Sequence, residues 1–206
     1  MFMSMAAAIS QPPPPREPLP EQRITIHGVR WNDYVMLRES LETPGLRMTF
    51  CQGALEIMSP SRLHEMWKTS IARLVELYAM ERDLPLLGYG STTFRLEAKE
   101  RGAEPDECYR VGLMMKDGEF PDIVLEVLAT NPLLDKLLVY RGFDVPEVWL
   151  FREGVFEIHR LREGGYVRVE RSELLPELDF ALIGRLAVRE DQHAALKELR
   201  EVLRAR

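Results

Sequence analysis

Hydrophobic and polar residues follow two different spacings along the chain from Arg23 onward. Alternating apolar and polar positions bounded by turn residues are typical of half-buried strands. Alternating positions, one apolar run at 123–128 and the turn residues between segments predict short strands, in chain order, around Ile24 and Ile26 and then at 47–51, 54–58, 91–96, 107–111, 123–128, 147–151, 155–161 and 166–170. Gln52-Gly53 and Gly164-Gly165 each separate two of these segments, so both pairs of strands are expected to form hairpins.

Helical spacing is clearest between about His64 and Arg82, where apolar residues recur on one face. The members of this stripe are Trp67, Ile71, Leu74, Val75 and Tyr78. A stripe of this kind is nearly always core, so we assign no chemistry to it. Further helices are predicted from Asn32 or Asp33 to about Leu41, at 133–141 and at 191–204.

The order of elements in the middle of the chain indicates the architecture. A strand at 123–128, a helix at 133–141 and a strand at 147–151 form a crossover, which makes the two strands parallel members of one sheet. The chain is therefore expected to have a mixed α/β (α+β) fold with a central mixed sheet flanked by helices.

The first 21 residues differ in composition from the rest of the chain. Four consecutive prolines, Pro12 to Pro15, favour an extended segment without a hydrogen-bond ladder. We predict a disordered Pro-rich tail at 1–21, with an incorrectly chosen start codon as the alternative, and a single domain at 22–206. The segment before the prolines lacks the positive region of a signal peptide.

Composition and charge narrow the classes of function. The chain has 206 residues, of which 46% are hydrophobic and 29% charged, as in ordinary globular proteins. A formal net charge of −6 argues against tight non-specific binding to a polyanion, although a local basic groove stays possible. Two cysteines without a motif favour a reducing cytoplasm, and no apolar run approaches the ~20 residues of a membrane-spanning helix.

Glu126 is the most informative single residue, because it interrupts the apolar strand at 123–128. A salt bridge or a strand end reaching water explains one such carboxylate. Asp106, which follows Pro105 at the head of the preceding strand, could meet Glu126 across two adjacent strands. Two close carboxylates repel, and a divalent cation is the usual way for both to stay ionised. Oxygen ligands without a His or Cys cluster indicate Mg²⁺ or Mn²⁺.

Two other residues near Glu126 are candidates with equally plain structural explanations. Lys136 lies on the first turn of the next helix, where its amine could orient a water or stabilise negative charge. As an isolated residue it would be read as a solvated surface lysine. Asp122 lies four residues before Glu126, on the same strand face, and is either a supporting acid behind the metal ligands or the start of the strand.

Several short segments of the chain, which together span roughly residues 28 to 178, match the sequence pattern of one family in the same order. They are Gly53-Ala54-Leu55-Glu56-Ile57-Met58-Ser59-Pro60 with His64-Glu65, Gly90-Ser91-Thr92-Thr93-Phe94, Gly102-Ala103-Glu104-Pro105-Asp106-Glu107-Cys108-Tyr109, Pro121-Asp122-Ile123-Val124-Leu125-Glu126-Val127, Leu134-Asp135-Lys136 with Tyr140, and Val145-Pro146-Glu147-Val148-Trp149. Through them the chain resembles the Uma2 family (DUF820) of endonucleases, which have the PD-(D/E)xK restriction-endonuclease-like fold.

The resemblance implies roles for individual residues. Asp106 corresponds to the Asp of the PD half-motif and Glu126 to the acid of the (D/E)xK half-motif. Leu128 stands where the lysine of that motif would be, and Lys136 resembles a migrated version of it. His64 matches a family signature and is expected near the metal ligands. Its neighbour Glu65 is a candidate further ligand, or a helix-start residue that favours the helix dipole.

The resemblance implies a Mg²⁺-dependent endonuclease that hydrolyses DNA, with Asp106 and Glu126 as metal ligands and Lys136 assisting catalysis. The alternative is a nuclease-like fold retained as a non-catalytic nucleic-acid-binding or regulatory module. A third possibility is hydrolysis of RNA or another phosphodiester. A homodimer is plausible, since two-fold assemblies are the commonest and duplex cleavage uses two active sites.

Overall fold

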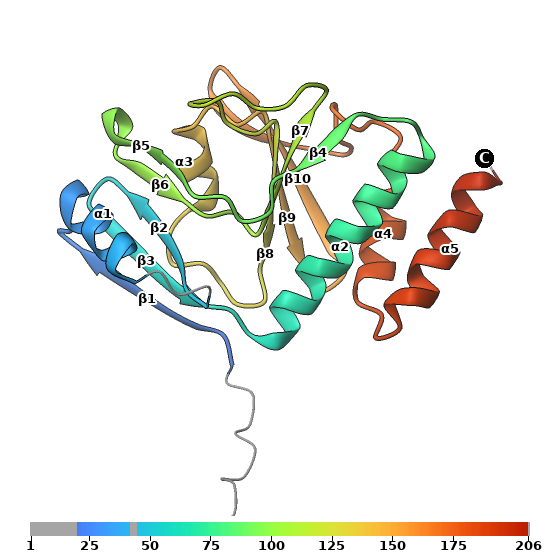
Figure 1. Ribbon diagram of the computed structural model, residues 1–206, viewed down its shortest axis with the longest axis horizontal. Coiled ribbons are helices and arrows are strands. Elements are labelled where there is room, and N and C mark those ends of the chain that lie inside the picture. The colour runs from blue at the N-terminus through green and yellow to red at the C-terminus, as the bar shows by residue number, and fades with distance from the viewer. Residues whose placement is uncertain (1–19, 42–44, 206) are drawn as a thin grey trace, which may run out of the picture.

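Two β-sheets and the helices that cover them make up the part of the chain that the structure describes (Figure 1). The structure is a computed structural model, and it describes residues 20–41 and 45–205. The predicted tail at 1–19 lies outside the described residues. Pro20 and Glu21, which we assigned to the tail, are described, and the Glu21 side chain is buried. The described fold therefore starts before the predicted boundary.

The first sheet is antiparallel and has the strand order β1-β3-β2-β6-β5. Its strands are β1 (Gln22–His27), β2 (Arg47–Cys51), β3 (Ala54–Ser59), β5 (Phe94–Leu96) and β6 (Arg101–Ala103). The predicted hairpin is present, with Gln52 and Gly53 at φ 46° and 83° in its turn. Positive φ at both positions is what a two-residue hairpin of this twist requires.

The second sheet is mixed and has the strand order β11-β10-β9-β8-β7-β4. Its strands are β4 (Leu86–Gly88), β7 (Glu107–Val111), β8 (Ile123–Val127), β9 (Glu147–Arg152), β10 (Val155–Arg162) and β11 (Gly165–Val169). Strands β8 and β9 are parallel, as the predicted crossover requires, and the other pairs are antiparallel. The prediction of a mixed sheet flanked by helices is confirmed.

Helices cover both faces of the mixed sheet (Figure 1). They are α1 (Trp31–Ser40), α2 (Arg62–Glu81), α3 (Lys136–Arg141), α4 (Phe180–Ala187) and α5 (Gln192–Arg204), with a short 3-10 turn η1 (Glu97–Lys99). The apolar stripe of α2 packs with α4 and α5 against one face of the mixed sheet. Helix α3 packs on the opposite face, and α1 packs on the antiparallel sheet through Tyr34 and Phe50. No helix in the described ranges is long and apolar enough to cross a membrane.

The alternation along β8 decides which side of the sheet each residue serves. Leu125 and Val127 contribute to the core beneath α2, α4 and α5. Val124 contributes to the core beneath α3, and Glu126, two residues further on, is on that same side. The carboxylate of Glu126 therefore faces α3 in an otherwise apolar layer.

Some elements differ from the predicted pattern. The strand predicted at 91–96 is present only at Phe94–Leu96, and helix α3 begins at Lys136, three residues later than expected. Strands β4 and β6 have only three residues each, which is too short for alternation to reveal. Helix α4 was not predicted, although Asp179 caps it by accepting a hydrogen bond from Leu182 N.

Candidate active site

Asp106, the residue directly before β7, lies opposite Glu126 of the adjacent strand β8. Strands β7 and β8 pair antiparallel with Glu107 opposite Leu125, so one further step of the register sets Asp106 against Glu126. Both side chains are almost completely buried, at 1% and 2% exposure. The expected meeting of these two carboxylates is thus present in the structure, and each raises the cost of ionising the other.

Asp106 is held by one donor on each carboxylate oxygen. Its Oδ2 accepts a hydrogen bond from Val127 N at 2.7 Å, and its Oδ1 lies 2.8 Å from His64 Nε2. Burial opposes ionisation of Asp106, but the His64 hydrogen bond and charge outweigh it, so the pKa of Asp106 is below its ordinary value. Asp106 is therefore ionised at neutral pH.

His64 bridges two carboxylates at the start of helix α2. Ser61 caps the helix by accepting a hydrogen bond from His64 N, which fixes the backbone at this point. The ring Nδ1 lies 2.8 Å from Glu21 Oε2, so the ring connects Glu21 to Asp106. Burial favours the neutral ring, but hydrogen bonds to Asp106 and Glu21 outweigh it and raise the pKa of His64 to about 9. The imidazolium donates to both acids.

Two side chains donate to Glu126, and both contact the same carboxylate oxygen. Its Oε1 accepts a hydrogen bond from Tyr140 Oη and lies 3.2 Å from Lys136 Nζ. Burial raises the pKa of Glu126 above its ordinary value, the Asp106 charge adds to that rise, and Lys136 opposes it. Among the described residues, no hydrogen bond reaches the second oxygen of Glu126. That oxygen is available to a ligand.

Lys136 reaches the acid pair from the first residue of α3. Asp135 caps this helix by accepting hydrogen bonds from Leu137 N and Leu138 N, which turns Lys136 toward the sheet. Its Nζ contacts Glu126 and donates to Thr49 Oγ1 of β2 at 3.2 Å. The predicted contact between the Lys136 amine and the acid pair is therefore present.

Three residues of this cluster were missed as site residues. Tyr140 follows Lys136 by four residues on the same helix, and that spacing was a usable signal that both face Glu126. Thr49 lies in a hairpin with nothing in its sequence to mark it. Glu21 was missed because it follows the proline-rich segment and was assigned to the tail.

Two predicted site residues lie outside the cluster. The Glu65 side chain is 40% exposed and pairs with Lys68 Nζ at 2.8 Å and Arg47 at 3.8 Å. Asp122 accepts a hydrogen bond from Val111 N at 2.9 Å and closes the far end of the β7–β8 pair. Four residues of strand place it about 13 Å from Glu126. Neither carboxylate contacts the acid pair, so of the two explanations for Asp122 its contacts fit the start of the strand.

The donor set determines what kind of metal ion this site can hold. No group of three or more His, Cys, Asp or Glu side chains suited to a metal occurs in residues 20–41 and 45–205. Asp106 and Glu126 together supply carboxylate oxygens only, and these are the ligands of hard cations such as Mg²⁺. Since Mg²⁺ is commonly held by one or two carboxylates with waters and substrate phosphate, two acids are sufficient. The residues present fit such an ion.

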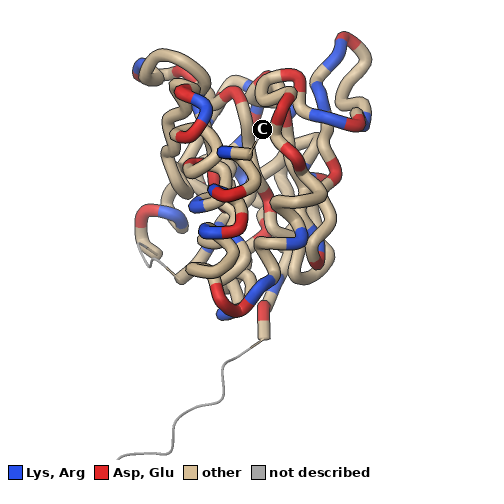
Figure 2. The backbone as a smooth tube through the Cα atoms, turned by 90° about the vertical axis from the view of Figure 1, so that its right-hand side faces the viewer, with Lys and Arg blue, Asp and Glu red and all other residues tan. Residues whose placement is uncertain are grey.

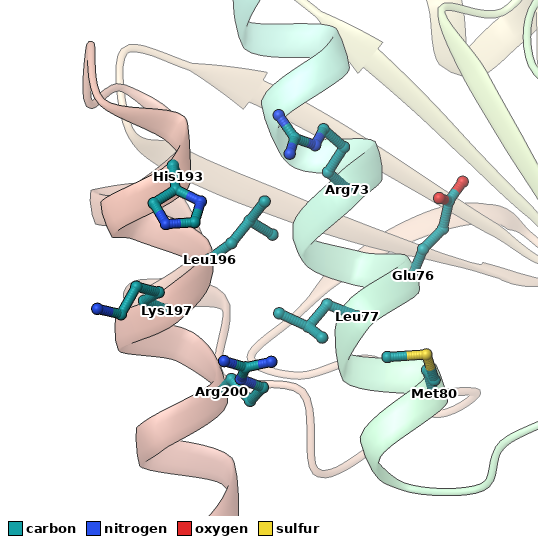
Figure 3. A pocket seen from close by; sticks show the side chains of 8 residues that line it. All are labelled: Arg73, Glu76, Leu77, Met80, His193, Leu196, Lys197 and Arg200. Atoms are coloured by element: carbon teal, nitrogen blue, oxygen red, sulfur yellow. The ribbon is translucent and has the colours of Figure 1, made fainter.

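Open space near the site lies beside Lys136. A cavity of about 350 Å³ is lined by Lys136 and by mostly apolar residues between Leu128 and Leu137, together with Leu150. A second groove, of about 410 Å³, lies between α2 and α5 (Figure 3). Its apolar lining includes Leu77 and Leu196, and none of its lining residues belongs to the site at Asp106 and Glu126. Of these two, the cavity at Lys136 borders the site.

The fold and the site together define a class of protein. A mixed sheet flanked by helices, with an acid pair on two adjacent strands, is a restriction-endonuclease-like fold. The chain matches the model of the Uma2 family, described as "Putative restriction endonuclease", over residues 31–188. The protein belongs to the Uma2 family. A search of curated proteins gave no match.

Proposed function

We propose that this protein is a divalent-metal-dependent endonuclease that hydrolyses DNA phosphodiester bonds at the Asp106–Glu126 pair. The observation that carries the proposal is the contact of Lys136 Nζ with Glu126 at 3.2 Å. It supplies the amine of a (D/E)xK site from a helix, although the strand has Leu128 at that position. Family membership supports the nuclease class, and the metal and the DNA substrate are parts of the proposal.

Asp106 and Glu126 would hold a Mg²⁺ or Mn²⁺ ion. When bound, such an ion polarises a phosphate oxygen and lowers the pKa of a water molecule. The chain's own contribution is to keep the two carboxylates fixed and close together. Val127 N and His64 fix Asp106, while Tyr140 fixes Glu126. Because the two carboxylates are already in position, the protein does not have to rearrange them during the reaction.

Lys136 acts on the reacting water and on the phosphate charge. Its ammonium is 5% exposed and is held between Glu126 and Thr49, so its position is set before substrate binds. From there it orients the attacking water and stabilises the negative charge that develops on the phosphate. Thr49 is a positioning residue, because it acts through Lys136.

Substrate access requires a neighbouring segment to move, because Asp106, Glu126 and Lys136 are all at most 5% exposed. The segment between β8 and α3 borders the site. It is held by hydrogen bonds from Leu133 N to Glu56 at 2.6 Å and between Thr130 and Glu21. Displacing this segment would open the acid pair toward the cavity beside Lys136.

The test is cleavage of plasmid, single-stranded and branched DNA by purified wild-type protein with Mg²⁺ or Mn²⁺, with RNA as a parallel substrate. We expect cleavage by the wild type, none without divalent ions, and none by Glu126→Gln. Circular dichroism establishes that the variant is folded, and calorimetry measures metal binding by both proteins. Absence of both cleavage and ion binding in the wild type would overturn the proposal and favour the non-catalytic module. Preferential cleavage of RNA would replace the DNA assignment.

A further inference from the structure

Charged residues of both signs are mixed along the chain of this protein. Acidic and basic residues are interspersed along the tube in Figure 2, without one block of a single sign. With a formal net charge of −6, a site for an anion has to be built locally, from cations that are not already neutralised by neighbouring carboxylates.

Arg101 is a buried cation of this kind. Arg101 is 6% exposed, and its Nη1 donates to two backbone carbonyls, Lys99 O at 2.9 Å and Glu100 O at 3.3 Å. Its Nε is buried without an acceptor. No carboxylate within the described ranges forms an ion pair with it. A guanidinium has five N–H donors, so three of them have no protein acceptor here.

The backbone at Gly142 makes the burial of Arg101 possible. A Cβ atom at position 142 would stand 2.5 Å from Arg101 Cγ and 2.8 Å from its Nε. Any residue other than glycine would therefore displace the arginine side chain. An unpaired buried charge is unfavourable, so burying the Arg101 guanidinium costs free energy unless an anion pairs with it.

Arg101 lines a cavity of about 530 Å³ between β6, the end of α3 and the β10–β11 turn. Its charged lining residues are Lys99, Arg101, Arg141, Asp144, Arg162 and Glu163. Four cations therefore face two carboxylates. This local excess of positive charge contrasts with the acidic balance of the whole chain.

Two of the four cations are neutralised and two are not. Lys99 pairs with Asp144 at 2.7 Å, and Arg162 pairs with a carboxylate outside the lining, that of Glu173. Arg141 is exposed and forms no ion pair or hydrogen bond with any residue in the described part of the chain. Arg101 and Arg141 are thus two guanidinium groups that share one cavity and lack a counter-ion.

We propose that this cavity is an anion site that binds a phosphate group between Arg101 and Arg141. A phosphate offers several acceptor oxygens to the planar fork of each guanidinium, which is the geometry that arginine recognises best. The group comes either from a free phosphate ion or from a nucleic-acid backbone. In the second case the inference rests on the proposed function. Arg141 and Lys136 would then contact the same nucleic-acid strand from helix α3, where they are about 8 Å apart along the helix axis.

The first experiment uses inorganic phosphate as the probe, titrated calorimetrically into the full-length protein in chloride buffer without divalent ions. We expect saturable binding by the wild type. Arg141→Gln, an exposed substitution, should weaken it about tenfold, because a charge-assisted hydrogen bond is lost. Arg185→Gln is the matched control, since Arg185 is also an exposed arginine and lies on α4, outside the cavity. It should leave binding unchanged.

The second experiment measures binding of a DNA duplex to the same proteins in the presence of EDTA, so that no cleavage enters. Weaker DNA binding by Arg141→Gln but not by Arg185→Gln, without detectable free phosphate binding, assigns the phosphate to nucleic acid. Loss of free phosphate binding alone assigns it to the ion. The inference is overturned if Arg141→Gln changes neither, or if the wild type binds neither probe. Since no metal is present, a protein without nuclease activity can still pass both tests.

Discussion

Glu126 and Glu147 are both buried carboxylates on paired strands, yet their surroundings differ completely. Strands β8 and β9 are parallel neighbours, and the two residues are 2% and 0% exposed. Glu147 has donors on both of its oxygens. They are Trp149 Nε1 at 3.0 Å, Ser172 Oγ at 2.6 Å, Glu173 N at 2.7 Å and Leu174 N at 3.2 Å.

Glu126, in contrast, has donors on one oxygen and an ionised acid opposite it. Tyr140 and Lys136 both bind Oε1, and Asp106 faces it across the strand pair. A buried carboxylate with every lone pair satisfied serves the fold. A buried carboxylate that has an oxygen without a donor and lies next to a second acid is suited to binding a cation. Burial alone does not separate these two roles, whereas the distribution of donors does.

Glu126→Gln should have the largest effect, a loss of cleavage rate. The amide keeps the shape of the side chain but removes a charged oxygen ligand, so cleavage should fall about a thousandfold or more. Some folding stability should also be lost at pH 7, because the buried Lys136 ammonium loses its charged partner. Initial cleavage rates and urea unfolding check both parts. A variant that cuts at the wild-type rate would remove Glu126 from the site.

Glu147→Ala should reduce folding stability and not cleavage. It leaves the Trp149 indole, the Ser172 hydroxyl and the Glu173 amide without an acceptor, which should cost about 4 kcal/mol of the free energy of unfolding. Urea unfolding measures this loss. Cleavage by the remaining folded protein should be close to wild type. A loss below about 1 kcal/mol would mean that the hydrogen bonds of Glu147 are not what keeps it buried.

His64→Gln should make stability depend on pH differently from the wild type. The pKa of His64 is raised to about 9, so the charged ring stabilises the folded state fully below its unfolded value near 6.5. This contribution, roughly 3 kcal/mol, is lost as the pH rises from 6.5 through 9. The stability difference between wild type and variant should therefore be largest near pH 6 and small near pH 9.5. Urea unfolding at both pH values tests it, and a constant difference would contradict the charged ring.

Lys136→Ala should slow cleavage about a hundredfold while changing metal affinity much less, because the amine acts on the water and phosphate. Lys136→Arg should restore little, since a planar fork does not replace a compact ammonium. Single-turnover rates and metal titrations separate the two quantities. Cleavage by Lys136→Ala at the wild-type rate would end its catalytic role and leave the carboxylate pair intact.

Tyr140→Phe should give the smallest effect. It removes one hydrogen bond to Glu126 and no ligand, so we expect a loss of about tenfold in cleavage rate. Addition of more Mg²⁺ should recover part of it if Tyr140 only positions Glu126. An effect as large as that of Glu126→Gln would assign the phenol a direct part in the reaction.

Local rules applied to the sequence were sufficient for the elements that carry the acids. An apolar run interrupted by Glu126, a preceding strand headed by Asp106 and a following crossover helix specify two adjacent strands and the helix above them. The contact between Lys136 and the acid pair followed from the same placement, because the first turn of a crossover helix lies near the end of the strand before it.

The rest of the cluster depended on contacts between segments far apart in the sequence. Glu21 meets His64 across 43 positions, and Lys136 meets Thr49 across 87. Neither Glu21 nor Thr49 has a local pattern that marks it, because a hydrogen-bonding partner is selected by three-dimensional proximity. The missing ion partner of Arg101 is of the same kind, since a lack of neighbours is visible only once all the described neighbours are placed.

Patterns within short stretches of the sequence predicted the two hairpins, the parallel pair β8 and β9 and the two carboxylates that could meet, because alternation and the crossover rule are local. How each buried charge is satisfied depends on contacts that form only in the folded chain. Glu126 and Glu147 look alike as acids in apolar strands, and only the folded chain gives four donors to one of them and a second acid to the other. The physical reason is that the ionisation of a buried group is set by the few atoms within hydrogen-bond distance of it.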